Sequence, residues 1–288
     1  MRINNNIMAM NANRQLGINN NGMAKALEKL SSGFRINRAG DDAAGLSISE
    51  KMRGQIRGLV QASRNAQDGI SLIQTAEGAL QETHAILQRM RELVVQAGNL
   101  GTNQKEDLQA IQDEINALIE ELGGTSGSKG ISDRTQFNGK TLLDGTYKVS
   151  GGSTLTFQIG ANADQKVELT IEDMSAEGLG VNNIDVTNFT TIDSGTHFNA
   201  QLGKVDSAIE KVSQERSKLG AMQNRLEHTI KNLDNAAENL QAAESRIRDV
   251  DMAKEMMEFT KQSILQQAST AMLAQANNLH STVLKLLG

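Results

Sequence analysis

The same seven-residue apolar spacing runs through both halves of the chain, and it restricts the possible folds more than any other feature. The apolar positions are Met52, Leu59, Ala66, Ile73, Leu80, Leu87 and Val94 in the first half, and Val205, Val212, Leu219, Leu226, Leu233, Leu240 and Ile247 in the second. A strict seven-residue period keeps one stripe of a helix facing a partner along its whole length. Seven such positions extend over about 43 residues, or roughly 65 Å of helix. We therefore expect two long helices packed side by side.

The composition agrees with long uninterrupted helices. The 288-residue chain contains no Pro, Cys or Trp, whereas average usage predicts roughly 14 prolines, the residue that breaks helix interiors. Without Cys the chain forms neither disulfides nor thiolate metal sites. A soluble four-helix bundle is the alternative fold, but its helices are usually shorter and joined by short loops.

Both ends of the chain carry apolar stripes but no acidic residues. Residues 1–27 and 259–288 contain basic side chains and no Asp or Glu. The apolar positions are Ile3, Ile7, Met10, Leu16, Met23, Leu27 and Leu30 at the amino end, and Leu265, Met272, Leu279 and Leu286 at the carboxyl end, with Ala268, Ala276 and Val283 beside them. Such short amphipathic helices are marginal in isolation. We expect them to need partners, the alternative being frayed termini.

Start and stop signals divide the helical parts. A first helix is expected over about 4–33, ending at Gly33, because glycine readily takes the left-handed conformation of a helix end. The spacing of Ser47 and Glu50 fits a capping box that starts the first rod. The spacing of Asn103 and Glu106 repeats it for a second helix that ends near Leu122 and folds back on the rod.

The middle of the chain has a different pattern. From Gly123 to about Gly203 the sequence is rich in Gly, Ser, Thr and Asn, and alternation replaces the seven-residue period. The alternating apolar residues are Leu155, Phe157 and Ile159, followed by Val167, Leu169 and Ile171. Period-two alternation with glycine-containing turns indicates β-hairpins. The expected fold is mainly α: a long antiparallel helical rod with coiled-coil-like terminal helices and a small inserted β-hairpin region.

Three domains follow from these patterns. Residues 1–45 and 255–288 form a terminal helical domain, residues 46–125 and 200–254 a helical rod, and residues 126–199 a short β-rich, surface-exposed region. The net charge of −5 is spread out, and no basic block forms a phosphate-binding face, which argues against nucleic acid as a partner. We find no membrane-spanning run and no apolar segment typical of a secretory signal.

The sequence offers no recognised chemistry. The four histidines lie too far apart in the sequence for a paired-histidine zinc motif, and no phosphate-binding glycine loop occurs. Asp41 with Asp42, and Asp249 with Asp251, are better explained by helix capping or ion pairing than by acid–base catalysis. We assign no catalytic, cofactor-binding or metal-binding residues and predict a chain that is not an enzyme.

Two signatures resemble a known family. LSSGFRINRAGDDAAGLSISEKMRGQIRGL, residues 30–59, closely resembles the amino-terminal signature of bacterial flagellin. SRIRDVDMAKEM, residues 245–256, and AMLAQAN, residues 271–277, resemble its carboxyl-terminal signature. The matches are distant in the chain and in the correct order, and TQFNGKTLLDGTYKV, residues 135–149, extends the resemblance into the strand region.

The resemblance implies the main subunit of the extracellular flagellar filament, a helical homopolymer built through paired terminal helices. It implies export through the flagellum's own channel without a cleaved signal, and growth under a filament cap. A flagellar export chaperone is expected on residues 255–288, and hook-junction proteins are further partners. The middle, only about 75 residues long, predicts a comparatively thin and smooth filament.

A third match concerns recognition by a host. QRMRELVVQAGN, residues 88–99, resembles the segment recognised by the flagellin-sensing Toll-like receptor of animals. The matching positions are Arg89 and Leu93, with Glu114 on the next helix. The alternative explanation is structural, with Arg89 a solvated rod residue, Leu93 a packing residue and Glu114 a surface charge.

We expect assembly to be coupled to ordering: the terminal segments become fully helical when neighbouring subunits bury their apolar stripes. Two other functions remain. A hook-filament junction protein also has paired terminal helices, but the close arm signatures favour the bulk subunit. A filament-displayed enzyme would need a site in the short middle, which lacks metal and nucleophile motifs.

Overall fold

The computed structural model describes the backbone of residues 6–99, 101–124, 129–149, 153–189 and 194–287, and the side chains of these residues except 194 and 279–287. The chain divides into two compact units. The smaller combines both ends, residues 1–56 and 238–288, and the larger contains residues 57–237. The helices α2 (Ala43–Ala97) and α6 (Ser194–Arg248) contribute to both units.

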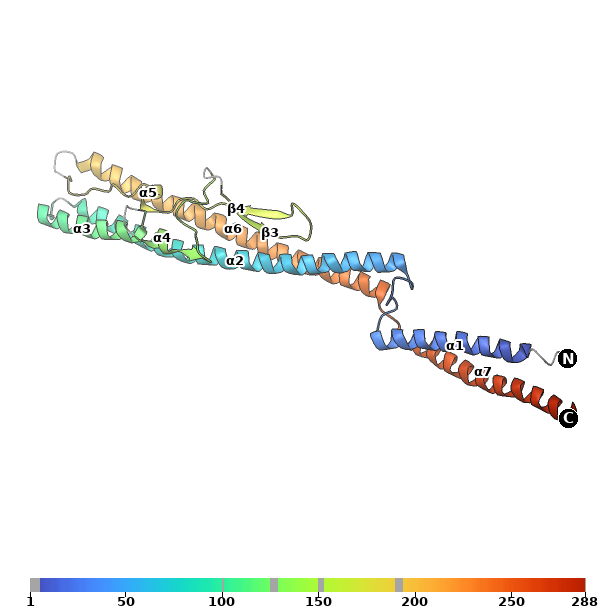
Figure 1. Cartoon of the computed structure of the whole chain (residues 1–288). Helices are drawn as coiled ribbons and strands as arrows, with labels where there is room; N and C mark the ends of the chain where they lie inside the picture. Colours follow the sequence, from blue (N-terminus) through green and yellow to red (C-terminus); the bar gives the residue numbers. More distant parts are fainter. Residues whose placement is uncertain (1–5, 100, 125–128, 150–152, 190–193, 288) are drawn as a thin grey trace. The chain divides into compact units, whose positions relative to one another are not determined.

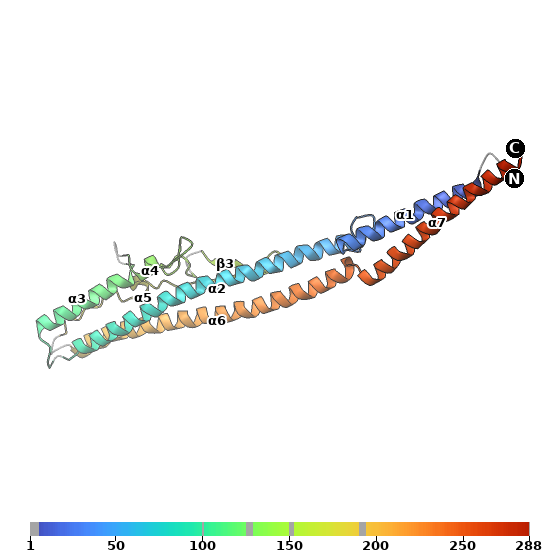
Figure 2. The same ribbon diagram turned by 90° about the horizontal axis from the view of Figure 1, so that it is seen from below.

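The seam between α2 and α6 forms the core of the larger unit. In Figures 1 and 2 the two helices lie side by side. Arg91 pairs with Asp206, and Ser63 donates to Asp234, so the helices run antiparallel. The predicted stripe residues are completely buried from Ala66 to Val94 and from Val205 to Leu226. The side-by-side helices and the mainly α fold predicted from the sequence are confirmed.

The helix α3 (Lys105–Leu122) packs on the same core. Its buried residues include Leu108, Ile115 and Leu122, and it ends at Leu122 and lies back on the rod, as predicted. The predicted cap was wrong by one residue: the capping box consists of Gln104 and Asp107, whose carboxylate accepts the Gln104 N–H at 2.9 Å. Asn103 lies in the turn between α2 and α3 instead, where its side-chain amide donates a hydrogen bond to the Gln96 carbonyl.

The start of α2 also differs from the prediction. The helix begins at Ala43, and the Asp42 carboxylate accepts the backbone N–H of Gly45 at 2.8 Å. Ser47 is an exposed residue inside the first turns. Asp, like Ser, is a good helix cap. Because Asp42 lies five residues before Ser47 and accepts a free N–H group of the first turn, the helix has already begun when the chain reaches Ser47. The predicted Ser47–Glu50 capping box is therefore wrong.

The middle of the chain forms two small antiparallel sheets. The strand β1 (Gln136–Phe137) pairs with β2 (Lys140–Thr141), and β3 (Leu155–Gln158) pairs with β4 (Lys166–Leu169). In the second hairpin Leu155 lies opposite Leu169 and Phe157 opposite Val167, so the predicted alternation is confirmed. Two single-turn helices, α4 (Ile131–Arg134) and α5 (Ala176–Leu179), were not predicted.

The β3–β4 hairpin lies directly on α2. A Cβ atom at Gly58 would stand 2.8 Å from the Ala161 side chain, and one at Gly69 would stand 3.2 Å from the Phe157 ring. Between them, the Asn65 side chain donates to the Gln158 carbonyl at 3.0 Å. Because Gly58 and Gly69 have no side chain, the hairpin can approach the helix closely. Asn65 donates a hydrogen bond to a hairpin carbonyl that would otherwise lack a partner in the sheet.

The segment after β4 is attached to α6 by polar side chains. Lys204 donates to the Asn183 carbonyl and Lys211 to the Gly178 carbonyl, at 3.0 and 3.1 Å. From α3, the buried Gln112 donates to the Ile184 carbonyl and accepts the Val186 N–H. These hydrogen bonds pair backbone carbonyl and N–H groups of a segment that does not belong to a β-sheet.

In the smaller unit, α1 (Ile7–Ser32) packs against α7 (Met252–Leu287). Gly33 ends α1 in the left-handed conformation, as predicted. The two connecting segments form a single β-bridge between Phe34 and Asp249. Arg248 stacks over the Phe34 ring at 4.8 Å, so a charged side chain covers this junction.

Glu215 gives the larger unit a pH dependence. Its side chain is only 6% exposed, beside a hollow of about 240 Å³ whose charged residues are Glu172, Asp173 and Lys211. Burial raises the pKa of the Glu215 carboxyl, while the nearby Lys218 ammonium and hydrogen bonds oppose that rise. The folded state therefore favours the protonated acid, and this stabilisation is lost as the pH rises through the raised pKa.

We predict that Glu215→Gln unfolds at a higher temperature than the unchanged protein at pH 7, because the amide needs no proton to be neutral. The two proteins should converge below about pH 4.5, the unperturbed value for the acid. Thermal unfolding of free subunits across this range is the measurement. A lower unfolding temperature for Glu215→Gln at pH 7 would show that the carboxylate is net stabilising there.

Candidate functional site

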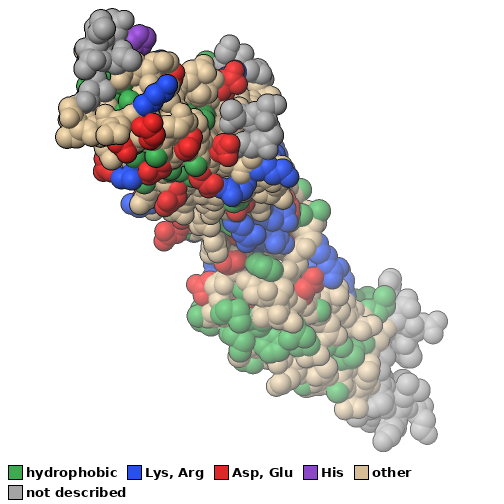
Figure 3. Space-filling model, turned by 90° about the vertical axis from the view of Figure 1, so that its left-hand side faces the viewer, with side chains coloured by type: hydrophobic (Ala, Val, Ile, Leu, Met, Phe, Trp, Pro, Cys, Tyr) green, Lys and Arg blue, Asp and Glu red, His purple; other side chains and the backbone are tan. Residues whose placement is uncertain are grey.

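The terminal helices expose large apolar side chains. Met8 and Met257 are 67% and 68% exposed, and Ile264 is 61% exposed. In Figure 3, hydrophobic side chains form green patches on the fainter, more distant part of the surface. The exposed set in α1 and α7 comprises Ile7, Met8, Met10, Ile18, Leu27, Met252, Met256, Met257, Ile264, Leu265 and Met272. Apolar patches of this kind mark interaction surfaces.

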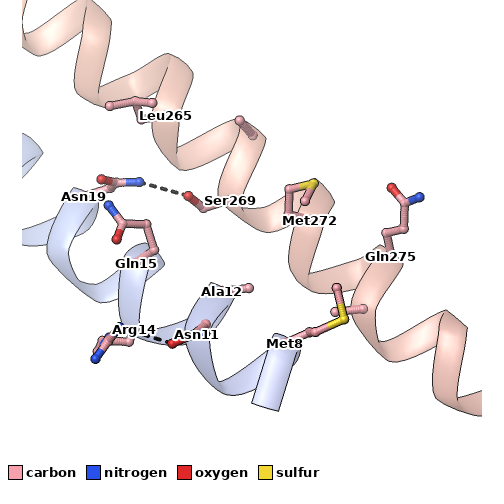
Figure 4. A pocket seen from close by; sticks show the side chains of 12 residues that line it. Met8, Asn11, Ala12, Arg14, Gln15, Asn19, Leu265, Ser269, Met272 and Gln275 are labelled. Carbon is pink, nitrogen blue, oxygen red and sulfur yellow. Dashed lines mark hydrogen bonds between the residues drawn. The ribbon is translucent and has the colours of Figure 1, made fainter. Parts of the chain in front are cut away.

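A groove of about 720 Å³ opens between α1 and α7. Figure 4 shows Met8 and Met272 at this groove, on opposite helices, with Arg14 turned away from α7. Its lining is mainly apolar and amide side chains, and among the described lining residues Arg14 is the only charged group. The groove can take apolar side chains of another helix, and none of its described lining residues is an acid, a base or a metal ligand of the kind that catalysis needs.

The contact between α1 and α7 is partly polar. Ala26 and Ala276 are buried, and the side-chain amide of the buried Asn19 donates to the Ser269 hydroxyl at 2.9 Å. Gly22 leaves room for Gln262 on the facing helix. A buried polar pair of this kind fixes the register of two helices. The sequence analysis missed Asn19, although a polar residue at the expected contact face is a usable signal.

The predicted terminal stripes are only partly covered within one chain. Leu16, Met23 and Leu30 are half-buried, whereas Leu265 and Met272 are exposed. Ile3 and the side chains of Leu279, Val283 and Leu286 lie outside the described residues. The expectation that these stripes need partners stays a prediction, with exposed Leu265 and Met272 as its support.

The structure brings Arg89 and Glu114 together. Arg89 donates through Nε and Nη2 to one Glu114 oxygen at 2.9 and 2.8 Å, and through Nη1 to Glu92. The Glu114 carboxylate raises the pKa of the Arg89 guanidinium. Leu93 is 1% exposed and belongs to the core. A partner at this surface therefore touches Arg89 and Glu114, while Leu93 supports the helix beneath them.

The paired aspartates have structural roles. Asp41 accepts the N–H groups of Arg38 and Asn37, and these bonds lower the pKa of its carboxyl. Asp251 accepts the N–H of Ala253 at the start of α7. Among the described residues, no three His, Asp or Glu side chains are arranged to hold a metal ion. None of the described helices contains a stretch long and apolar enough to span a membrane.

Two models of a known protein family match the chain, one over its amino-terminal part and one over its carboxyl-terminal part. A family model described as the bacterial flagellin N-terminal helical region matches residues 3–148, and one described as the C-terminal helical region matches residues 202–287. The chain belongs to the bacterial flagellin family. It is accordingly a structural component of the flagellar filament, as the signatures in its two arms suggested.

Curated relatives match over the full length of this flagellin-family chain. A flagellin of Bacillus subtilis is 63% identical over 311 residues, with both chains covered completely. The flagellar filament 33 kDa core protein of Treponema phagedenis is 52% identical, again over the whole of both chains. This similarity favours the bulk filament subunit over a junction protein.

One solved structure is similar in fold alone. A putative flagellar hook-associated protein from Vibrio parahaemolyticus is 13% identical, with a TM-score of 0.57, over 73% of this chain and 100% of its own. The comparison agrees with the paired long helices.

Leu93→Ala should destabilise the free subunit, because it empties a buried site in the core. The expected loss of unfolding free energy is about 2–5 kcal/mol, measured by chemical denaturation. Val95→Ala is the matched control, since Val95 lies two residues away on the same helix and is 46% exposed. Equal unfolding midpoints for the two variants would contradict the core position of Leu93.

Proposed function

We propose that this filament subunit polymerises by burying the exposed apolar side chains of α1 and α7 against neighbouring copies. The observation that carries the proposal is the exposure of eleven large apolar residues among the described side chains of these two helices. They lie in the smaller unit, whereas the larger unit has a complete core of its own. Residues 1–45 and 255–288 thus act in polymerisation, and residues 46–125 and 200–254 as the rod.

The free energy involved is sufficient for assembly. Burying one Leu, Ile or Met side chain contributes roughly 1.5–3 kcal/mol, so a few such contacts offset the cost of association. Added burial also favours helix in the terminal segments, which are marginal without it. Contacts between unlike surfaces of successive copies continue without closing, and so give a filament.

Before assembly the same side chains need cover. We infer that the segment 255–288, with exposed Met256, Met257 and Ile264, is the binding site of an export chaperone. The same proposal includes export without a cleaved signal and an extracellular position. It also includes growth under a filament cap and contact with hook-junction proteins. The outer region 126–199 would then face solvent on the filament.

Ile264→Asp should block assembly without unfolding the subunit. Ile264 is exposed in one chain, so the charge meets water in the free protein but an apolar surface in the filament. We expect the concentration needed for seeded polymerisation to rise about tenfold or more, since each 1.4 kcal/mol is a factor of ten. Sedimentation measures the concentration at which polymer forms, and negative-stain electron microscopy checks that the polymer is a filament.

Gln267→Asp is the matched control, because Gln267 is an exposed polar residue on the same helix. It places the same charge three residues away and should assemble far better than Ile264→Asp. Equal assembly of Ile264→Asp and the unchanged protein, with full helicity in both, would remove the basis of the proposed function.

A second role is proposed for the surface around Arg89 and Glu114. We infer that the free subunit binds the host flagellin-sensing Toll-like receptor there, because both side chains are exposed and hold each other in one geometry. Arg89→Ala should lower signalling by purified subunit, with Gln81→Ala, another exposed α2 position, as control. Unchanged signalling by Arg89→Ala would rule out this contact.

A further inference from the structure

Two faces of the larger unit carry opposite charge with the same spacing. Residues 51–67 contain four basic residues and no Asp or Glu. Within the larger unit this run presents exposed Arg57, exposed Val60 and exposed Arg64 on α2. We call Arg57, Val60 and Arg64 the basic face. Within the part of the chain that the structure describes, neither arginine takes part in an ion pair.

The opposite charge lies on α3. This helix has six acidic residues and one lysine. Glu114 and Glu121 are already paired, with Arg89 and Arg134. The outward line, which we call the acidic face, consists of exposed Glu106, Ala110, Asp113, Ala117 and Glu120.

The two faces fit each other in spacing. Arg57 and Arg64 are seven residues apart, as are Glu106 and Asp113, and seven residues rise about 10 Å along a helix. Two ion pairs can therefore form together. Between them, Val60, which is 42% exposed, would meet the small Ala110. An apolar contact flanked by opposite charges is a usual interface pattern.

The faces of one chain do not meet. The Arg89–Glu114 ion pair places α3 beside that part of α2. Arg64 lies 25 residues earlier on the same helix, which is roughly 38 Å away. Only a second molecule can bring an acidic face to a basic face.

We propose that the acidic face of one copy packs on the basic face of a second copy, and that this contact orders the rods in the filament. The proposal rests on the proposed function, since it specifies a second surface of the same assembly. It involves none of the exposed apolar residues of α1 and α7. Its failure is therefore distinguishable from failure of assembly through the terminal helices.

The test exchanges the charges. The first variant carries Arg57→Glu and Arg64→Glu, and the second carries Glu106→Lys and Asp113→Lys. Each alone should elongate seeds at least about tenfold more slowly, because like charges then face each other. An equimolar mixture should recover to within about threefold of the unchanged protein, since opposite charges again alternate. A chain with all four changes should also recover.

Lys140→Glu with Lys148→Glu is the control for the first variant, because both lysines are exposed and lie outside the two faces. It should elongate normally. Thermal unfolding of each variant checks the fold, and recovery in the mixture itself requires folded subunits.

Normal elongation of both charge variants would overturn the pairing and leave terminal-helix assembly intact. Slow elongation in the mixture would overturn it too, since each face would then serve a different contact. If the unchanged protein itself fails to elongate seeds, the proposed function fails instead.

Discussion

The larger unit depends on the apolar seam between α2 and α6. Its residues are excluded from water from Ala66 to Val94 and from Val205 to Leu226. The other elements of this unit pack around the seam: α3 adds Ile115 to its core, and the hairpin rests on α2 through Gly58 and Gly69. None of these small elements has enough buried surface to be stable alone.

The terminal pair also packs two long helices together, but its contact surface buries far less apolar side chain. Where α2 buries Ile, Leu and Val, α1 buries only Ala26 and Asn19. Its register is fixed by a polar contact from Asn19 to Ser269, while the larger side chains of α1 are half-buried or exposed. One chain therefore divides its apolar residues between self-contained packing in one unit and surfaces for other molecules in the other.

The sequence predicted the long helices because their period repeats many times, so local irregularities do not hide it. It misplaced the starts of α2 and α3, since Ser47 and Asn103 each stand three residues before a glutamate, whereas the true caps are Asp42, three residues before Gly45, and Gln104, three residues before Asp107. The single-turn α4 and α5 are too short for any period. In the receptor segment, the motif identified Arg89, Leu93 and Glu114, but only the fold shows that Leu93 points inward.

The pairing of α1 with α7 joins the two ends of the chain. The Asn6 side chain donates to the carbonyl of Ala276, 270 positions away. Nearly every residue must therefore be synthesised before the first helix can find its partner. Contacts of such large sequence separation form late in folding, because the intervening loop must close first. The larger unit can therefore fold before α1 and α7 come together.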